Sequence, residues 1–155
     1  MVLGFTGSGV LGLQPQRDWV TLNAYALNMR LQPTGIVTGA CVGVDAFVHH
    51  FFHETYPEVH RTVVVPANRR SVDTSVLGTA NTLIECTPGT SYRHRNTRMV
   101  ELSDQMAAFW HGAHRSGTFM TMNIAHRAGK MPLNNLFGHG LTDAEVRRRF
   151  MEHLA

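Results

Sequence analysis

The chain has 155 residues, of which 43% are hydrophobic, and this length suits one domain with a core large enough to fold alone. No segment reaches about 18 uninterrupted apolar residues, so we expect no transmembrane helix. The formal net charge of +3 is compatible with phosphate-bearing ligands, but it is too small to indicate nucleic-acid binding by itself.

The first residues, MVLGFTGSG, lack the basic stretch that begins a signal peptide, and they predict a strand instead. The two cysteines, Cys41 and Cys86, fit neither a disulfide framework nor a zinc motif. Free thiols are typical of a reducing compartment, so we expect a cytoplasmic protein.

Apolar runs alternate with segments of helical period along the chain. The clearest helix covers 43–55, where apolar residues follow the i, i+3, i+4, i+7 spacing. In chain order we predict strand 2–7, helix 16–31, strand 35–40, helix 43–55, strand 61–67, a strand or extended loop at 81–87, helix 95–103, strand 105–110, helix 116–129, a short strand that begins at 131–133, and a final helix at about 142–154 with a capping box at Thr142 and Glu145.

This alternation indicates an α/β fold with a doubly wound, mainly parallel sheet and helices on both faces. We expect one Rossmann-like domain over residues 1–155. Residues 67–94 are the least regular part, and a loop this long in a compact domain is often functional. In such a sheet, ligands bind at the carboxyl ends of the strands.

Glycine-rich segments follow the first two strands. Gly7 and Ser8 belong to a TGSG turn, where glycine lets the backbone approach an anion closely, although a tight turn alone also explains it. The second segment, TGACVGVD, contains the candidates Gly39, Ala40, Gly43 and Asp45. Asp45 stands in the first turn of a helix, where the helix dipole favours it; it could also accept hydrogen bonds from a ribose or from the loop beside it.

Two further groups of candidates follow later strands. Pro66 closes the third strand and begins the segment 66–70. Arg93, Arg95 and Arg98 match phosphate geometry, and arginine is poorly placed for the dipole at a helix start, so an anion nearby would explain them; we select Arg95 with its neighbour Asn96.

The segment AFWHGAHRSGT joins a strand end to a helix start. Trp110 could stack on a base, but a role in the core is equally consistent with its position. Ser116, Gly117 and Thr118 present backbone N–H groups where a phosphate binds well, and Ser116 could instead only cap the helix.

Metal binding is not expected. His49 and His53 have i, i+4 spacing, but we place them on the wetter side of their helix, and no third ligand is evident. We therefore predict no metal and no cofactor.

Four segments together resemble the SLOG superfamily: VTGACVGVDAFVHH, VVVPA, RNTRMVELSDQMAAFW and SGTFMTMNIAHRAGKMPL. This group of Rossmann-like proteins includes the LOG phosphoribohydrolases, the molybdenum-cofactor carrier proteins and the DprA/Smf DNA-processing proteins. The order of the segments matches across roughly residues 2–133. The sequence looks most similar to small DprA-like or YspA-type members, including proteins encoded by phages.

The resemblance implies a nucleotide or nucleotide-containing ligand over the strand ends. GACVGVD is similar to the G-x-x-x-G-x-D segment of DprA and YspA-type proteins, and RNTRM resembles the segment that carries the catalytic arginine of LOG enzymes, which falls at Arg95. SGT resembles the end of the LOG motif P-G-G-x-G-T-x-x-E. The proline and first glycines of that motif are absent here, and its glutamate is replaced by Thr121, which cannot act as a carboxylate base.

Three functions follow, in order of preference. The first is binding of a nucleotide or nucleotide-derived ligand, which the protein would sense, sequester or carry without a catalytic residue. The second is DprA-like binding of single-stranded DNA along Arg69, Arg70, Arg93, Arg95 and Arg98. The third is N-glycosidic hydrolysis with Asp45 or Glu85 as the acid. The sequence leaves open whether the protein forms a homo-oligomer, and it indicates no membrane partner.

Overall fold

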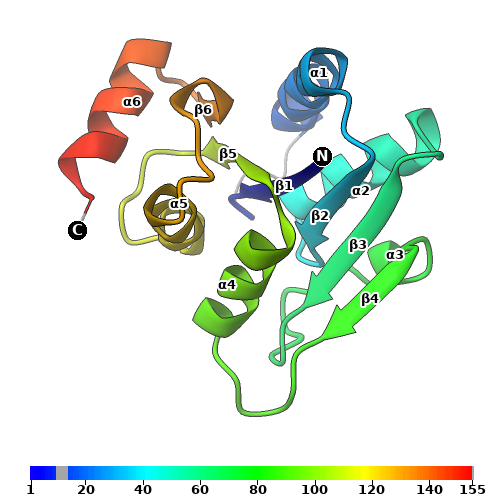
Figure 1. The fold of residues 1–155 in the computed structure, drawn as a ribbon. Coiled ribbons are helices and arrows are strands. Elements are labelled where there is room, and N and C mark those ends of the chain that lie inside the picture. The colour runs from blue at the N-terminus through cyan, green and yellow to red at the C-terminus, as the bar shows by residue number, and fades with distance from the viewer. Residues whose placement is uncertain (10–13, 155) are drawn as a thin grey trace.

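The computed structural model describes residues 1–9 and 14–154 (Figure 1). Its strands are β1 (Val2–Gly7), β2 (Gly35–Gly39), β3 (His60–Val65), β4 (Thr82–Glu85), β5 (Gln105–Trp110) and β6 (Leu136–Gly138). Its helices are α1 (Gln14–Leu31), α2 (Val44–Thr55), α3 (Thr74–Leu77), α4 (Tyr92–Leu102), α5 (Gly117–Arg127), α6 (Asp143–Glu152) and a 3₁₀ turn, η1 (Leu133–Asn135).

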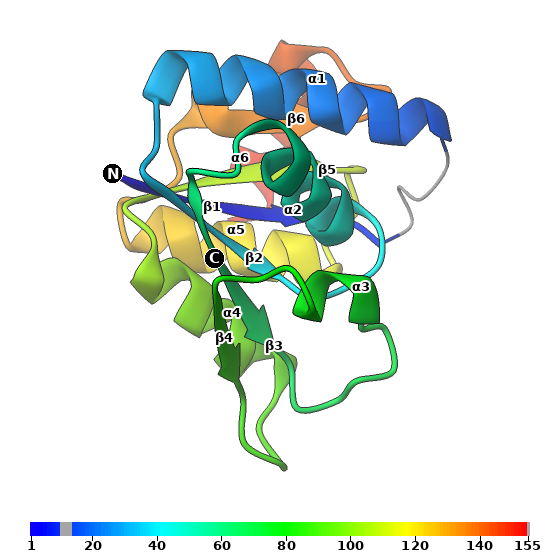
Figure 2. The same cartoon turned by 90° about the vertical axis from the view of Figure 1, so that its right-hand side faces the viewer.

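The six strands form one parallel sheet in the order β4-β3-β2-β1-β5-β6. The chain builds outward from β1 to β4 and then crosses back through α4 to place β5 on the other side of β1. The helices α1, α2 and α3 cover one face, and α4, α5 and α6 cover the other (Figures 1 and 2). The predicted Rossmann-like, doubly wound fold is therefore confirmed.

This topology determines where a ligand site is expected. The chain passes from β1 to β2 on one side of β1. The strand on the other side of β1 is β5, which the chain reaches only after β4. Such a switch point leaves a crevice outside the carboxyl ends of the two strands, because the loops that follow them diverge. Here the crevice lies between the turn after Gly7 and the loop after Trp110.

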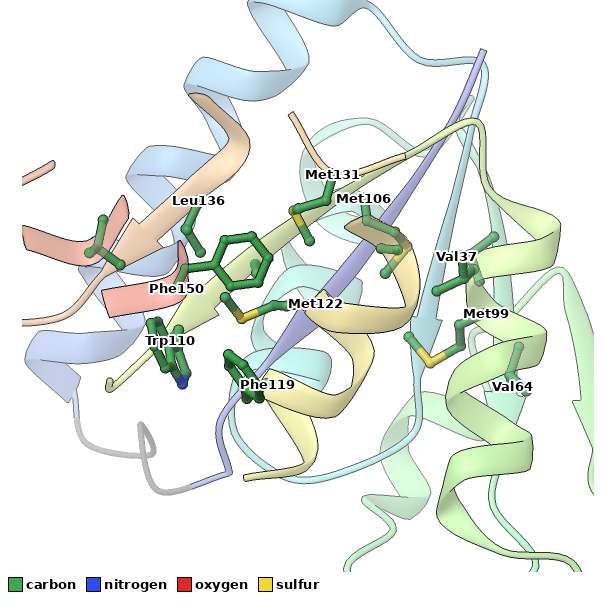
Figure 3. Close-up of a cluster of buried hydrophobic side chains, with 14 residues drawn as sticks. Val37, Val64, Met99, Met106, Trp110, Phe119, Met122, Met131, Leu136 and Phe150 are labelled. Atoms are coloured by element: carbon green, nitrogen blue, oxygen red, sulfur yellow. The ribbon is translucent and has the colours of Figure 1, made fainter. Parts of the chain in front are cut away.

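The core on the α4–α6 face contains large side chains from segments far apart in the sequence (Figure 3). Trp110 at the end of β5 packs against Phe119 of α5, with ring centroids 5.7 Å apart. Phe119 in turn contacts Phe150 of α6 at 6.0 Å. The final helix is thus attached to the sheet by its apolar side, as its period predicts.

The last strand begins later than predicted. Residues 131–133 do not start a strand, because the chain first makes the 3₁₀ turn η1 behind Pro132, which has no N–H for a strand ladder. The buried Asn135 side chain stabilises this turn by donating to the Met106 carbonyl oxygen, 3.3 Å away. Pairing with β5 begins only at Leu136.

The segment 67–94 is more regular than predicted. It contains α3, whose first turn is capped by the Asp73 side chain, and the edge strand β4, so the alternative of a strand at 81–87 is confirmed. The helix predicted at 95–103 begins one turn earlier because Ser91 caps it through the His94 N–H. None of the helices in the described part of the chain is both long enough and apolar enough to cross a membrane.

Candidate functional site

A cavity of about 380 Å³ opens at the carboxyl ends of the strands, at the switch point between β1 and β5. We call it the switch-point pocket. Its lining comes from the end of β1 and the turn after it, the loop after β2, the first turn of α2, the loop after β3, one side of α4 and the start of α5: Thr6, Gly7, Ser8, Gly9, Cys41, Val42, Asp45, Ser71, Tyr92, Arg95, Asn96, Met99, Ser116, Gly117, Thr118 and Thr121. The predicted candidates Gly7, Ser8, Asp45, Arg95, Asn96, Ser116, Gly117 and Thr118 are among them.

The turn after β1 is glycine-rich because α2 lies against it. A Cβ at Gly7 would overlap the side chain of Val44 in the first turn of α2. Gly43 caps α2 with φ +90°, a conformation that favours glycine, and a Cβ there would come within 2.8 Å of the Gly9 Cα atom. Gly43 therefore supports the pocket from behind without lining it, whereas Gly7 and Ser8 face the pocket.

The start of α5 forms another wall of the switch-point pocket and supplies backbone hydrogen-bond donors. The Ser116 hydroxyl accepts a hydrogen bond from the Phe119 N–H at 3.1 Å and donates one to the Ala113 carbonyl, so this side chain acts as the helix cap. The amides of Gly117 and Thr118 belong to the first turn, where backbone N–H groups have no acceptor within the helix. A Cβ on Gly117 would meet no atom within 4 Å, so the space beside this residue is open.

Arg95 lies at the back of the pocket, paired with a carboxylate of the protein. Its Nη1 is 3.8 Å from Oδ2 of Asp45, and both side chains are less than a tenth exposed. Its Nε donates to Oδ1 of Asn96 at 2.9 Å, and its guanidinium carbon lies 5.5 Å from the ring centre of Tyr92. The position of Arg95 near a helix start predicted a nearby anion, and the Asp45 carboxylate is such an anion.

Asp45 joins two elements that are distant in sequence. Its Oδ2 accepts a hydrogen bond from the Cys41 backbone N–H at 3.2 Å and also faces Arg95 on α4. Burial raises the pKa of the Asp45 carboxyl, while the charge of Arg95 and the Cys41 N–H act in the opposite direction. Asp45 has a structural role, and it also lines the pocket, where its carboxyl could meet a ligand.

Cys41 lies beside this pair, with its Sγ 3.9 Å from Nη2 of Arg95. Burial is the main reason that the pKa of the Cys41 thiol is raised, and the carboxyl of Asp45 adds to it, although Arg95 lowers it. The thiol is therefore the dominant form at neutral pH.

One side of α4 lines the pocket more fully than we predicted. Tyr92 and Met99 join Arg95 and Asn96 there, at the spacing i, i+3, i+4, i+7. That spacing could have identified both missed residues, because it places all four on one helix face. Tyr92 also donates a hydrogen bond from its hydroxyl to the Asn68 carbonyl at 3.2 Å, which connects α4 to the loop after β3.

Besides Gly43, four predicted candidates lie outside the pocket. Ala40 and Pro66 are buried, and the loop after β3 reaches the pocket through Ser71 instead. Gly39 lies behind the Arg95–Asp45 pair, and a Cβ there would overlap both side chains. Trp110 has no exposed surface, and its Nε1 donates to the Ala113 carbonyl at 2.9 Å; its ring is therefore part of the core and cannot stack on a base.

The arginines considered for a DNA track are divided among different environments. Arg95 is buried, Arg69 pairs with Glu85 on the exposed edge strand, and Arg98 pairs with Glu101 on the surface of α4. Glu85, one of the two acids considered for hydrolysis, therefore lies outside the pocket, whereas Asp45 lies in it.

The placement of His49 on the wetter side of α2 was wrong. His49 is fully buried, because the segment after α3 covers it and the Thr79 hydroxyl lies 2.7 Å from its Nε2. Burial lowers the pKa of His49 to about 4. Among the residues that the structure describes, no group of three or more His, Cys, Asp or Glu side chains is arranged to hold a metal ion.

No protein-family model and no curated protein matches this chain.

Proposed function

We propose that this protein binds a nucleotide or a nucleotide-derived ligand in the switch-point pocket. The observation that carries the proposal is the meeting, in one cavity, of the N-terminus of α5 with the buried Arg95. The first-turn amides of Gly117 and Thr118 and the helix dipole attract an anion, and Arg95 adds guanidinium N–H donors beside them, with a charge that Asp45 partly balances. A phosphate group satisfies these donors together.

The size and the remaining walls of the pocket support a small phosphorylated ligand. A volume of about 380 Å³ lies at the lower end of the range for small-molecule sites, which is about 300–1,000 Å³. Tyr92, Met99 and Val42 add apolar surface near the charged groups, as a nucleoside requires. Parts of all three motifs of the SLOG resemblance also line this pocket, through Asp45, Arg95 and 116–118, so the resemblance and the cavity direct the proposal to the same residues.

The proposal is tested by titration calorimetry with the four ribonucleoside monophosphates. Wild-type protein binds at least one of them, and Gly117→Val weakens that binding at least about 100-fold, because the branched side chain fills the space over the α5 amides. Gly78→Val is the matched control, since a Cβ at Gly78 also meets no atom within 4 Å but lies outside the pocket. Equal affinity in wild type and Gly117→Val would place the ligand elsewhere.

Binding of single-stranded DNA is the alternative function, and the same purified protein can be tested for it. Fluorescence anisotropy with an oligonucleotide at two salt concentrations distinguishes a distributed contact from a pocket. For DNA, Arg69→Ala and Arg70→Ala would each lower the salt slope by about 0.7. For a pocket ligand, neither substitution changes the affinity for the monophosphate.

A second candidate function is N-glycosidic hydrolysis with Asp45 as the acid. It is favoured by the raised pKa of this carboxyl within the pocket, whereas Thr121, at the position of the LOG glutamate, only donates a hydrogen bond to the Gly117 carbonyl. Chromatography of an incubation with AMP decides between the two functions: free adenine that is lost in Asp45→Asn favours hydrolysis, and intact AMP favours binding alone.

A further inference from the structure

One part of the switch-point pocket lies between α4 and α5, which pack against each other on the same face of the sheet (Figure 1). Side chains of β1, α4 and α5 line this part, which we call the inner chamber: Thr6, Asn96, Met99, Thr118 and Thr121. Each of these residues is less than a tenth exposed, whereas Val42 and Ser71, which also line the pocket, are exposed. None of the five carries a charge, so the inner chamber differs in chemistry from the Arg95–Asp45 pair.

Two hydroxyl groups of the inner chamber have no partner in the protein. The side chains of Thr6 and Thr118 make no hydrogen bond with any residue that the structure describes, although both residues are nearly buried. Neither hydroxyl oxygen is fully enclosed by protein, as the unpaired Thr38 hydroxyl on β2 is, so both retain surface on the cavity. An unpaired polar group at a buried position costs free energy, and a ligand that pairs with it removes that cost.

The Asn96 side chain offers donors to the inner chamber, and Arg95 determines this orientation. Arginine has only donor groups, so its Nε, 2.9 Å away, meets the Asn96 carbonyl oxygen Oδ1. The amide nitrogen Nδ2 then has two N–H groups to donate. Within the described part of the chain, its one partner is the Met120 sulfur at 3.7 Å, which is a weak acceptor. A nearly buried amide therefore lacks a strong acceptor.

The inner chamber lies deeper than the amides at the start of α5. Met120, next to the Asn96 amide, is three residues beyond Gly117, which is about 4.5 Å further along α5. A phosphate at the first turn of α5 therefore leaves the inner chamber to the uncharged group that carries it. In a nucleotide that group bears hydroxyl and carbonyl oxygens, which accept hydrogen bonds from an amide N–H.

We propose that the inner chamber is a subsite for the uncharged, oxygen-bearing part of the ligand, which Thr6 and Asn96 bind, and that Arg95 positions Asn96. This inference rests on the proposed function. Asn96 donates to a sugar hydroxyl or a base carbonyl oxygen, and the Thr6 hydroxyl donates to or accepts from a neighbouring group of the same moiety. Met99 adds apolar surface beside them.

Removing the Thr6 hydroxyl separates binding from a structural role. Thr6→Val keeps the shape of the side chain and does not lower the free energy of unfolding in urea, because it removes an unpaired hydroxyl. It weakens binding of the tightest ribonucleoside monophosphate about 3- to 10-fold in calorimetry. Thr38→Val is the matched control, since its hydroxyl is also unpaired but lies outside the pocket, and it leaves the affinity unchanged. An unchanged affinity in Thr6→Val, together with lost binding in Gly117→Val, would overturn the subsite and leave the proposed function intact.

Replacing Asn96 separates the uncharged part of the ligand from its phosphate. Asn96→Leu weakens the same monophosphate at least about tenfold and leaves the affinity for inorganic phosphate within about twofold. In an Arg95→Lys background, which keeps the charge but loses the Nε donor, Asn96→Leu costs less than in wild type because the amide is no longer oriented. Equal costs in the two backgrounds would refute the positioning role of Arg95, and equal losses for monophosphate and inorganic phosphate would refute the subsite.

Two sets of ligands identify the oxygen that Asn96 recognises. If it is a sugar hydroxyl, the 2′- or 3′-deoxy analogue binds at least about tenfold more weakly, and Asn96→Leu removes that difference. If it is a base carbonyl, IMP binds more tightly than AMP, or UMP more tightly than CMP, and Asn96→Leu again removes the difference. Wild-type protein that distinguishes none of these pairs would overturn the subsite. Failure to bind any monophosphate would refute the proposed function and the subsite together.

Discussion

Replacing Arg95 with methionine tests the electrostatics of the switch-point pocket, because it leaves Asp45 buried without its cation. Removing one partner of a buried ion pair costs about 3–5 kcal/mol. The separation of 3.8 Å and the hydrogen bond that Asp45 keeps with the Cys41 N–H place the expected loss near the lower limit, at about 3 kcal/mol. With a urea m value of about 2 kcal/mol/M, the unfolding midpoint falls by about 1.5 M at pH 7.

The loss depends on pH with a defined sign. Burial already holds the pKa of Asp45 above its unfolded value of 3.8, so the folded protein binds this proton more tightly than the unfolded chain does. Acidification therefore stabilises the fold through Asp45. Without Arg95 the pKa rises further, and the deficit of Arg95→Met relative to wild type shrinks as the pH falls from 7 to 5.

Urea unfolding at both pH values measures this deficit directly. Adding Asp45→Asn to Arg95→Met removes the buried charge and recovers more than half of the lost free energy of unfolding at pH 7. A deficit below about 1 kcal/mol, or one that is equal at pH 7 and pH 5, would refute the reasoning.

Two further substitutions test neighbouring features. The pKa of His49 is lowered to about 4, so the unfolded chain takes up this proton at a higher pH than the folded protein does. The free energy of unfolding of wild type therefore falls by up to about 3 kcal/mol between pH 6.5 and pH 4. His49→Gln removes that part of the loss, as urea titrations across this pH range measure. Gly39→Ala displaces the Arg95–Asp45 pair and weakens monophosphate binding at least about tenfold by calorimetry, whereas Gly78→Ala, with open space around its Cβ, leaves the affinity unchanged. An unchanged affinity in Gly39→Ala would show that the pair does not shape the pocket.

The sequence by itself determined the order of most elements, because each depends on local patterns, whereas the short helix α3 and the turn η1 were not predicted. The helical period at 43–55, the β-branched run at 61–67 and the capping box of the last helix are properties of neighbouring residues. Since connections between parallel strands return the chain to the same edge of the sheet, the sequence alone predicts that the segments after β1, β2 and β5 lie at one site.

The tertiary structure alone decided what each side chain in that site contacts. Arg95 and Asp45 are fifty positions apart, and only the packing of α4 beside the loop after β2 brings them together. Trp110 is buried by α5 and α6, and His49 is buried by the segment near Thr79. Local periodicity reveals neither contact. Burial and pairing depend on which distant segments pack together, and no short stretch of sequence contains that information.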